Sequence, residues 1–147
     1  MPICYNISPA LNMVIYVCKG SITAAEIFKT ADLVYSDERR KPNLITVLDL
    51  LSAVENIHVK DIYDTIEQIN VTAEKENGLV PEPIVLLSRS NGIHDLVNAI
   101  QLLPSKVPFK MDAFYTMEDA IISLGLLAVR QEILHFWQEC ISLSENS

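Results

Sequence analysis

The chain has 147 residues, of which 50% are hydrophobic, and its formal net charge is −8. This length suits one domain with its own core, and the hydrophobic content excludes a disordered chain. The acidic balance argues against nucleic acid as a partner and against adsorption to anionic membranes. We therefore expect one acidic, folded domain.

The cysteines indicate a reducing compartment. There are three, Cys4, Cys18 and Cys140, and none lies in a CxxC motif. An odd number without a motif predicts buried thiols, and a cross-strand pair of Cys4 with Cys18 is the alternative. The N-terminus lacks the pattern of a signal peptide, and no long uncharged apolar window is present. We expect a cytoplasmic protein without an integral membrane segment.

The first third of the chain predicts a hairpin and a helix. Residues 3–7 and 13–18 are short apolar runs around a turn-like segment, and Gly20 ends the second run. Thr23 and Glu26 then form a capping box that opens an amphipathic helix. Pro42 ends this region. The basic residues before it predict a solvated helix end, with an anion site as the alternative; they are Arg39, Arg40 and Lys41.

Residues 43–50 are apolar on both faces apart from Asp49, which we take as the end of the strand. A strand that is apolar on both faces is typical of the middle of a parallel sheet covered by helices.

After this strand, apolar spacing predicts a helix over 59–73, a buried strand over 84–87 and a helix over 93–100. Alternation over 109–113 predicts an edge strand. A last helix, capped at Thr116, is expected to run past Gly125 towards Cys140, followed by a frayed tail.

The element order is therefore β-β-α-β-α-β-α-β-α. A hairpin followed by βαβ units predicts an α/β fold with a mixed, mostly parallel sheet and helices packed on it.

Several local strings resemble the SpoIIAA-like family, whose members share the STAS architecture that is also compared with the Sec14/CRAL-TRIO fold. They are residues 13–17, Gly20 to Ile27 with its Gly-x-x-Thr-x-x-Glu-Ile spacing, the Val-Leu-Asp-Leu run at 47–50, and 118–125. The resemblance covers 3–125 and implies the STAS-like fold. It predicts a SpoIIAA-like domain over 1–125, a helical extension of the same domain over 126–141, and a frayed tail over 142–147.

In STAS antagonists of sigma-factor control, a Ser or Thr about ten residues beyond the Asp-Leu strand end is phosphorylated. In this chain that region holds His58, and the only hydroxyl between Asp49 and Asp61 is Ser52. We therefore expect no phospho-acceptor there.

Two places could carry chemistry. Asp49 ends the predicted central strand, where ligands of open α/β sheets bind; a carboxylate that only accepts backbone amides is the alternative. The loop after the strand at 84–87 offers hydroxyls, amides and an arginine for an anion, although it lacks a P-loop pattern. Plain capping of the next helix is the alternative. The candidate residues of this loop are Ser88, Arg89, Ser90, Asn91 and the nearby His94.

No motif for a metal, a cofactor or a catalytic nucleophile is present. None of the three histidines lies in a metal-binding spacing. We expect no metal, no cofactor and no enzyme activity.

The segment after Gly125 is apolar over more than one helical face, which indicates burial on several sides. A protein interface is the first interpretation, and a lid over an apolar ligand is the second. Aromatic side chains in such a patch favour a homodimer about a two-fold axis. The predicted interface residues are Leu126, Leu127, Val129, Ile133, Leu134, Phe136, Trp137 and Ile141.

The sequence thus predicts a non-enzymatic STAS-like regulatory or protein-interaction module. The alternative is a carrier for a small apolar, lipid-like ligand.

Overall fold

A computed structural model describes residues 2–55, 82–102 and 111–146. The predicted helix over 59–73, the candidate region around His58 and the start of the strand at 109 lie outside these ranges. The described strands are β1 (Ile3–Ser8), β2 (Met13–Ile22), β3 (Ile45–Glu55), β4 (Ile84–Leu87) and β5 (Met111–Phe114). The described helices are α1 (Ala24–Tyr35), α3 (Asn91–Gln101), α4 (Met117–Ser123), the short 3₁₀ helix η1 (Leu127–Val129) and α5 (Arg130–Glu145).

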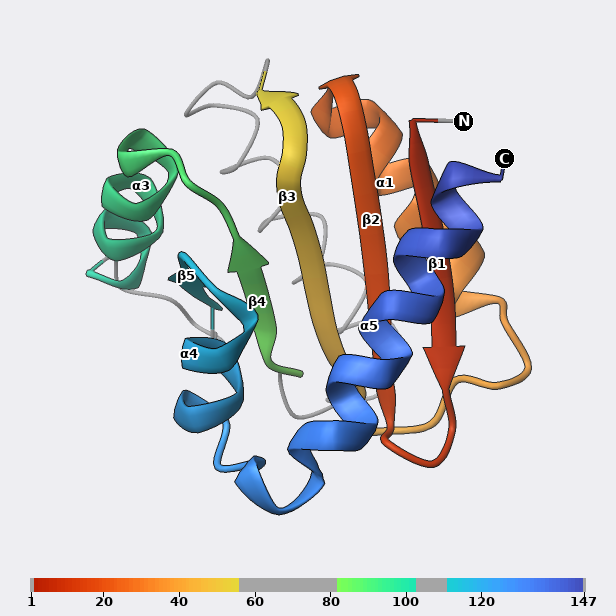
Figure 1. Ribbon diagram of the computed structural model, residues 1–147. Coiled ribbons are helices and arrows are strands. Elements are labelled where there is room, and N and C mark those ends of the chain that lie inside the picture. Colours follow the sequence, from red (N-terminus) through yellow and green to blue (C-terminus); the bar gives the residue numbers. More distant parts are fainter. Residues whose placement is uncertain (1, 56–81, 103–110, 147) are drawn as a thin grey trace.

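The five strands form one mixed sheet in the order β1-β2-β3-β4-β5 (Figure 1). β1 and β2 are antiparallel, and each later pair is parallel. The predicted α/β fold with an N-terminal hairpin and a mostly parallel sheet is confirmed. β3 is the central strand, as the sequence indicated.

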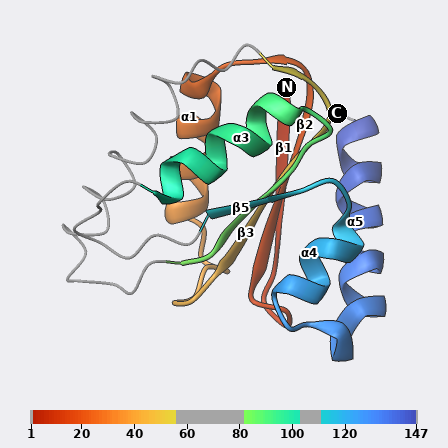
Figure 2. The same ribbon diagram turned by 90° about the vertical axis from the view of Figure 1, so that its left-hand side faces the viewer.

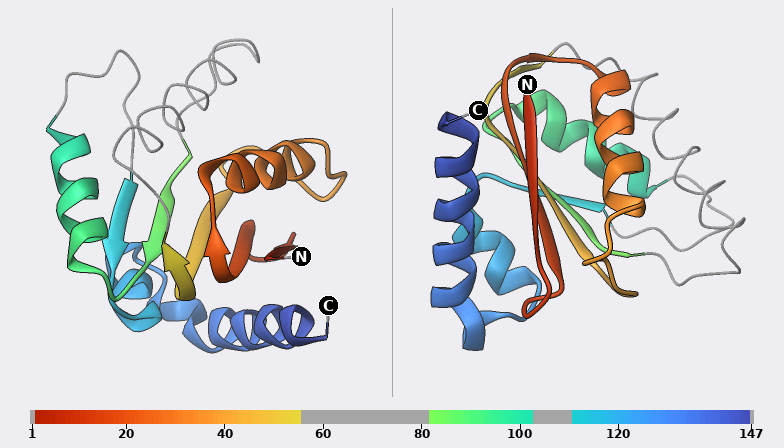
Figure 3. Two further views of the ribbon diagram at one scale, coloured as in Figure 1. Left: turned by 90° about the horizontal axis from the view of Figure 1, so that it is seen from above. Right: turned by 90° about the vertical axis from the view of Figure 1, so that its right-hand side faces the viewer.

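The helices cover both faces of the sheet. α1 and α3 lie on one face, and α4 and α5 lie on the other (Figures 2 and 3). Strand side chains alternate between these two layers. The layer under α1 and α3 contains Tyr16 and Leu48, whereas the layer under α4 and α5 contains Val17 and Val47. This is why the central strands are apolar on both faces.

Two strands are longer than the sequence predicted. β2 continues through Gly20, whose φ of +64° suits glycine, and ends at Ile22. β3 continues beyond Asp49 to Glu55. The extension remains paired with β2 through a bulge, at which Leu50 and Leu51 lie opposite the single residue Cys18. Asp49 is therefore inside the strand and not at its end.

The predicted single C-terminal helix is two helices. α4 is capped by the Thr116 hydroxyl, which accepts from the Asp119 amide at 3.2 Å, and it ends before Gly125. Gly125 has φ +71°, and the Leu126 amide donates back to the Ile121 carbonyl, as in a Schellman motif. α5 then continues to Glu145, so residues 142–145 are helical.

Candidate functional site

Asp49 is buried between the sheet and α5. Its side chain has an exposed fraction of only 4%. Its Oδ1 accepts from the Leu51 amide at 3.0 Å, and its Oδ2 accepts from Trp137 Nε1 at 2.7 Å. The first bond satisfies an amide at the β3 bulge, and the second fixes α5 to the central strand. Asp49 is therefore a structural carboxylate as in the alternative of the sequence analysis, except that one of its two donors is the Trp137 indole and not a backbone amide.

The loop from β4 to α3 is held together by its own side chains. Ser88 is fully buried, and its Oγ accepts from the Ser90 amide at 3.1 Å. The Ser90 Oγ in turn accepts from the Ile93 amide at 3.4 Å, which caps α3. The main chain of Ser88 is also tied to β5, because its amide donates to the Phe114 carbonyl. Helix capping, the alternative interpretation of these serines, is what the contacts show.

His94 completes this loop together with a residue that the sequence analysis missed. His94 Nε2 donates to the Ser88 carbonyl at 2.8 Å, because a carbonyl oxygen only accepts. The imidazole stacks on the Tyr115 ring with centroids 3.8 Å apart. The Tyr115 hydroxyl then donates to Asn91 Oδ1 at 2.6 Å. Tyr115 directly follows β5, so its position at the carboxyl edge of the sheet was a signal available in the sequence.

Arg89 differs from the other candidates. It lies on the exposed side of the loop, and it makes no hydrogen bond or ion pair with any residue in the described ranges. The structure thus brings Ser88, Ser90, Asn91 and His94 into one bonded network. It leaves the Arg89 guanidinium in solvent beside the start of α3.

The basic residues after α1 make structural contacts, while Arg39 and Lys41 stay exposed as expected for a solvated helix end and Arg40 is partly buried. Arg40 donates to Glu82 at 2.5 Å and lies over the Tyr35 ring, 4.4 Å from its centroid. Lys41 Nζ donates to the Pro9 carbonyl at 2.9 Å. These contacts hold the segment that follows α1 against the hairpin turn and the start of β4.

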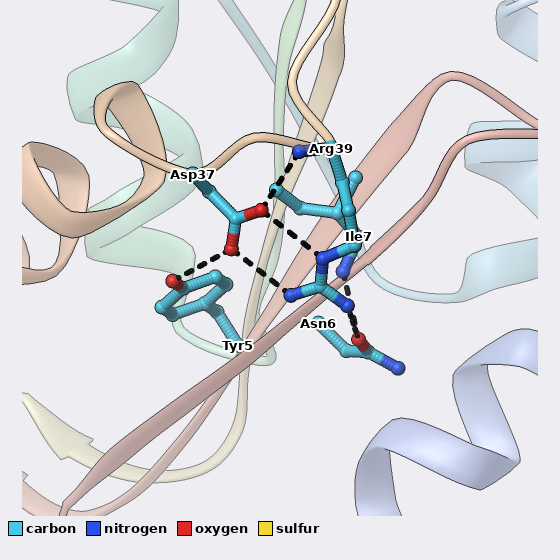
Figure 4. A network of polar contacts seen from close by, with 5 residues as sticks. All are labelled: Tyr5, Asn6, Ile7, Asp37 and Arg39. Carbon is cyan, nitrogen blue, oxygen red and sulfur yellow. Dashed lines mark hydrogen bonds and ion pairs between the residues drawn. The ribbon is translucent and has the colours of Figure 1, made fainter.

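Arg39 belongs to a polar network on β1, which is an edge strand (Figure 4). Its guanidinium donates to both oxygens of Asp37, and Tyr5 donates to Asp37 Oδ2 at 3.0 Å. Arg39 also donates to Asn6 Oδ1, which accepts from the Ile7 amide as well. The hydrogen bonds from Arg39 hold the pKa of the Asp37 carboxyl well below its usual range. This network covers part of the open edge of the sheet.

α5 packs on the sheet of its own domain. Within the predicted interface set, Ile133 is fully buried and Phe136 has an exposed fraction of 6%. Both lie in the core with the β2 side chains, and Trp137 and Ile141 pack against the same cluster. The assignment of Ile133 and Phe136 to an interface is corrected, because their own sheet takes up their apolar surface. Leu127 is 58% exposed, and dimerisation itself stays a prediction.

The remaining five residues of the predicted interface set have exposed fractions between those of Ile133 and Leu127. All are partly buried against the core on the α5 face: Leu126, Val129, Leu134, Trp137 and Ile141. The outward positions of α5 are mostly polar, so the helix is apolar on its sheet side and not all round.

The three cysteines are thiols. Cys4 pairs with Val17 across the hairpin, and Cys18 pairs with Ile3, so the two side chains point to opposite faces. The alternative of a Cys4–Cys18 cross-strand bond is therefore wrong. Burial raises the pKa of both Cys18 and Cys140 to about 12, with nearby Asp49 as a smaller cause.

The described ranges contain neither a cluster of metal-ligating side chains nor a helix that could span a membrane. No three His, Cys, Asp or Glu side chains there come together in a way that suits a metal ion. None of the described helices is long and apolar enough to cross a membrane.

Comparison with known proteins places the fold. No family model matches the chain, and no curated protein matches it. A solved structure does match, that of an uncharacterised protein from the DUF3478 family with a SpoIIAA-like fold, from Shewanella loihica PV-4. The TM-score is 0.52 at 11% identity, over 83% of this chain and 93% of that one. The chain therefore has a SpoIIAA-like fold, as the sequence resemblance implied, and at this identity the likeness concerns the fold alone.

Proposed function

We propose that the chain is a non-enzymatic STAS-like regulatory or protein-interaction module that acts as a homodimer. The SpoIIAA-like fold supports the class of protein, although a fold by itself does not define a function. One observation carries the proposal: most of the candidate polar side chains already make hydrogen bonds within the protein.

Asp49 is the main candidate for chemistry, and both of its oxygens accept hydrogen bonds from the protein. A general base or a ligand-binding carboxylate must reach its substrate, and only 4% of Asp49 is exposed. The serines of the β4–α3 loop and His94 are engaged in the same way by capping and by the loop carbonyl. These side chains therefore support the fold instead of meeting a small substrate.

Arg89 is the candidate that remains available to a partner. It is exposed and makes no bond within the described ranges, and it stands beside the amino end of α3. A guanidinium beside a helix amino end attracts carboxylates. We infer that an acidic side chain of a protein partner contacts Arg89.

The test is affinity enrichment with the tagged full-length chain from native lysate, followed by a binding isotherm with the purified partner. Arg89→Glu is the test variant, and Lys29→Glu on α1 makes the same charge change at an exposed lysine elsewhere. We expect one specific partner whose affinity falls about tenfold or more with Arg89→Glu, the effect of about 1.4 kcal/mol. The Lys29→Glu chain should bind normally.

One result would overturn the module, and another would overturn only the role of Arg89. The first is that no stoichiometric protein partner is recovered and the chain is monomeric at tens of micromolar in light scattering. The other is equal binding by the Arg89→Glu and Lys29→Glu chains, which would place the partner elsewhere and remove the role of Arg89.

A further inference from the structure

β1 is an edge strand, and every second residue of it directs its backbone groups away from the sheet. The Lys19 amide donates to the Pro2 carbonyl at 2.8 Å, so these two residues are a hydrogen-bonded pair of the antiparallel ladder. Such pairs alternate with pairs that make no ladder bond. The register therefore turns the N–H and C=O groups of Ile3, Tyr5 and Ile7 towards the outer edge. Groups of this kind are a template on which a further strand can pair.

One of these outward groups is capped by a side chain of the same strand. Asn6 Oδ1 accepts from the Ile7 amide at 3.0 Å, and the same oxygen accepts from the Arg39 guanidinium at 2.8 Å. A strand that pairs with β1 has to offer a carbonyl to the Ile7 amide in place of this oxygen. Pairing at Ile7 therefore requires that both hydrogen bonds of Asn6 break.

The cap is anchored from the other face of the sheet. Side chains alternate along β1, so Tyr5 lies on the α1 face, where its ring meets Tyr16, and Asn6 lies on the α5 face. Tyr5 donates to Asp37, which holds the Arg39 guanidinium, and Arg39 reaches Asn6 (Figure 4). Because β2 closes the inner side of β1, this connection between the two faces runs around the open edge. We call these four residues the edge network: Tyr5, Asn6, Asp37 and Arg39.

Charge makes the edge network hard to displace. Asp37 accepts from the Arg39 amide and from two N–H groups of its guanidinium, at distances of 2.9 to 3.1 Å. Hydrogen bonds between a guanidinium and a carboxylate are stronger than those between neutral groups, and the two-point contact fixes the direction of Arg39. A strand that approaches β1 thus meets a positive charge held in place at the edge. Charged side chains at an edge oppose edge-to-edge pairing.

We propose that the edge network closes β1 to the addition of a further strand. Without it, the outward groups of a six-residue strand are open to pairing, and in a purified sample the strand on offer is β1 of a second copy. The inference does not rest on the proposed function, because its measure is the difference in association between the native chain and its variants. A partner at Arg89, or a homodimer on another surface, is compatible with it.

The test variant is Asn6→Val. It removes the oxygen that caps the Ile7 amide and holds Arg39, and it keeps a residue that suits a strand. The control is Thr46→Val on β3, a change of the same kind at a position where both neighbouring strands are paired. Light scattering is recorded over a concentration series into the hundreds of micromolar. We expect the mass of Asn6→Val to rise at least about twofold above that of the native chain, as for pairing about a two-fold axis. Thr46→Val should match the native chain.

Residue-resolved hydrogen exchange then locates the contact. In the native chain the Ile7 amide has the Asn6 oxygen as its acceptor, whereas no described residue accepts from the Tyr5 amide. In dilute Asn6→Val we expect the Ile7 amide to exchange about fivefold faster than in the native chain, the loss of one hydrogen bond. In the associated form the Tyr5 and Ile7 amides should both become protected. The Cys4 and Ser8 amides face β2 and should stay protected throughout.

Arg39→Ala is the second variant, and it decides the question if Asn6→Val does not fold. It removes a side chain that is 45% exposed and leaves the strand sequence unchanged. We expect it to associate more than the native chain, again with protection of the Tyr5 amide.

Three results would overturn the proposal. The first is that the folded variants associate no more than the native chain. The second is association in which the Tyr5 amide still exchanges freely, because the contact then lies away from this edge. The third is a Tyr5 amide that is already protected in the native chain at high concentration and not on dilution, since β1 would then accept a strand with the edge network in place.

Discussion

Trp137 on α5 donates a 2.7 Å hydrogen bond to the buried Asp49 in the middle of β3. The other oxygen of Asp49 accepts from the Leu51 amide at the β3 bulge. A carboxylate accepts at both oxygens, whereas an asparagine offers only one acceptor. The pair thus joins the last helix to the central strand, and its hydrogen bonds show how a carboxylate is accommodated in an otherwise apolar layer.

The first prediction concerns this bond. Trp137→Phe keeps most of the apolar contact of the ring but leaves Asp49 Oδ2 buried without its donor. We expect the free energy of unfolding to fall by about 1–3 kcal/mol, the cost of an unsatisfied buried polar group. Urea unfolding followed by far-ultraviolet circular dichroism measures it. Tyr115→Phe is the control, because it removes an exposed hydrogen bond and should cost less than about 1 kcal/mol.

Much of the fold is readable from local patterns. Thr23 and Thr116 were predicted as helix caps, and each hydroxyl accepts from the amide three residues on. The apolar runs at β2, β3 and β4 were predicted as strands because their side chains fill two core layers. These features depend on neighbours within a few residues, which the sequence shows directly.

The missed features depend on distant parts of the chain. β3 continues beyond Asp49 because β2 provides a partner as far as Ile22, and no local pattern announces that pairing. Trp137 looked like an interface residue because its acceptor is 88 residues away. Gly125 was the local signal for the break between α4 and α5, because glycine readily adopts the positive φ at which α4 ends. The apolar residues on both sides of Gly125 made the two helices look like one.

The second prediction concerns acid. Arg39 lowers the pKa of Asp37, so the folded state holds a proton there less readily than the unfolded chain. This pair therefore stabilises the fold above the unfolded value of about 3.9, and its contribution is lost as the pH falls through the lower folded pKa. We expect Asp37→Asn to cost about 0.5–1 kcal/mol at neutral pH, as for an exposed ion pair.

The measurement is the unfolding free energy of the native chain and the Asp37→Asn chain across a pH series. The difference should be constant near neutrality and shrink below about pH 4. Arg39→Gln should cause a similar loss at neutral pH. A difference that grows in acid would contradict the assigned direction of the Asp37 pKa.

The third prediction concerns the cap of α4. Thr116→Ala removes the hydroxyl that accepts from the Asp119 amide, and we expect a loss of about 1 kcal/mol in thermal or urea unfolding. Thr116→Ser keeps the acceptor and should stay within a few tenths of a kcal/mol of the native chain. Equal losses in both variants would show that the methyl group, and not the hydrogen bond, supports this helix start.

The fourth prediction concerns phosphorylation. Ser52 is the only hydroxyl between Asp49 and Asp61, and it lies on β3 opposite Lys19 instead of in a loop. A kinase binds its acceptor in an accessible segment, and the backbone of Ser52 is fixed in the sheet. We therefore expect no stoichiometric phosphate on this stretch in protein purified from cells. Intact-mass spectrometry checks this, and a phosphopeptide that contains Ser52 would contradict it.

The fifth prediction concerns the thiols. Cys18 and Cys140 are buried, with exposed fractions of 0% and 2%, and burial raises the pKa of each to about 12. At pH 8 only about one in ten thousand of these groups is then a thiolate, which is the reactive form. Cys4 is only partly buried on the edge strand. We expect one thiol to react with a disulfide reagent in the native state and three after unfolding.

Cys4→Ser provides the control for this measurement. It should abolish the fast native-state reaction and leave two thiols that react only on unfolding. Cys140 also reports on α5, since its sulfur is covered only while that helix is docked on the sheet. If the sulfur of Cys140 reacts as quickly as that of Cys4 in the native protein, α5 spends much of its time undocked, and the burial of Phe136 and Trp137 is wrong as well.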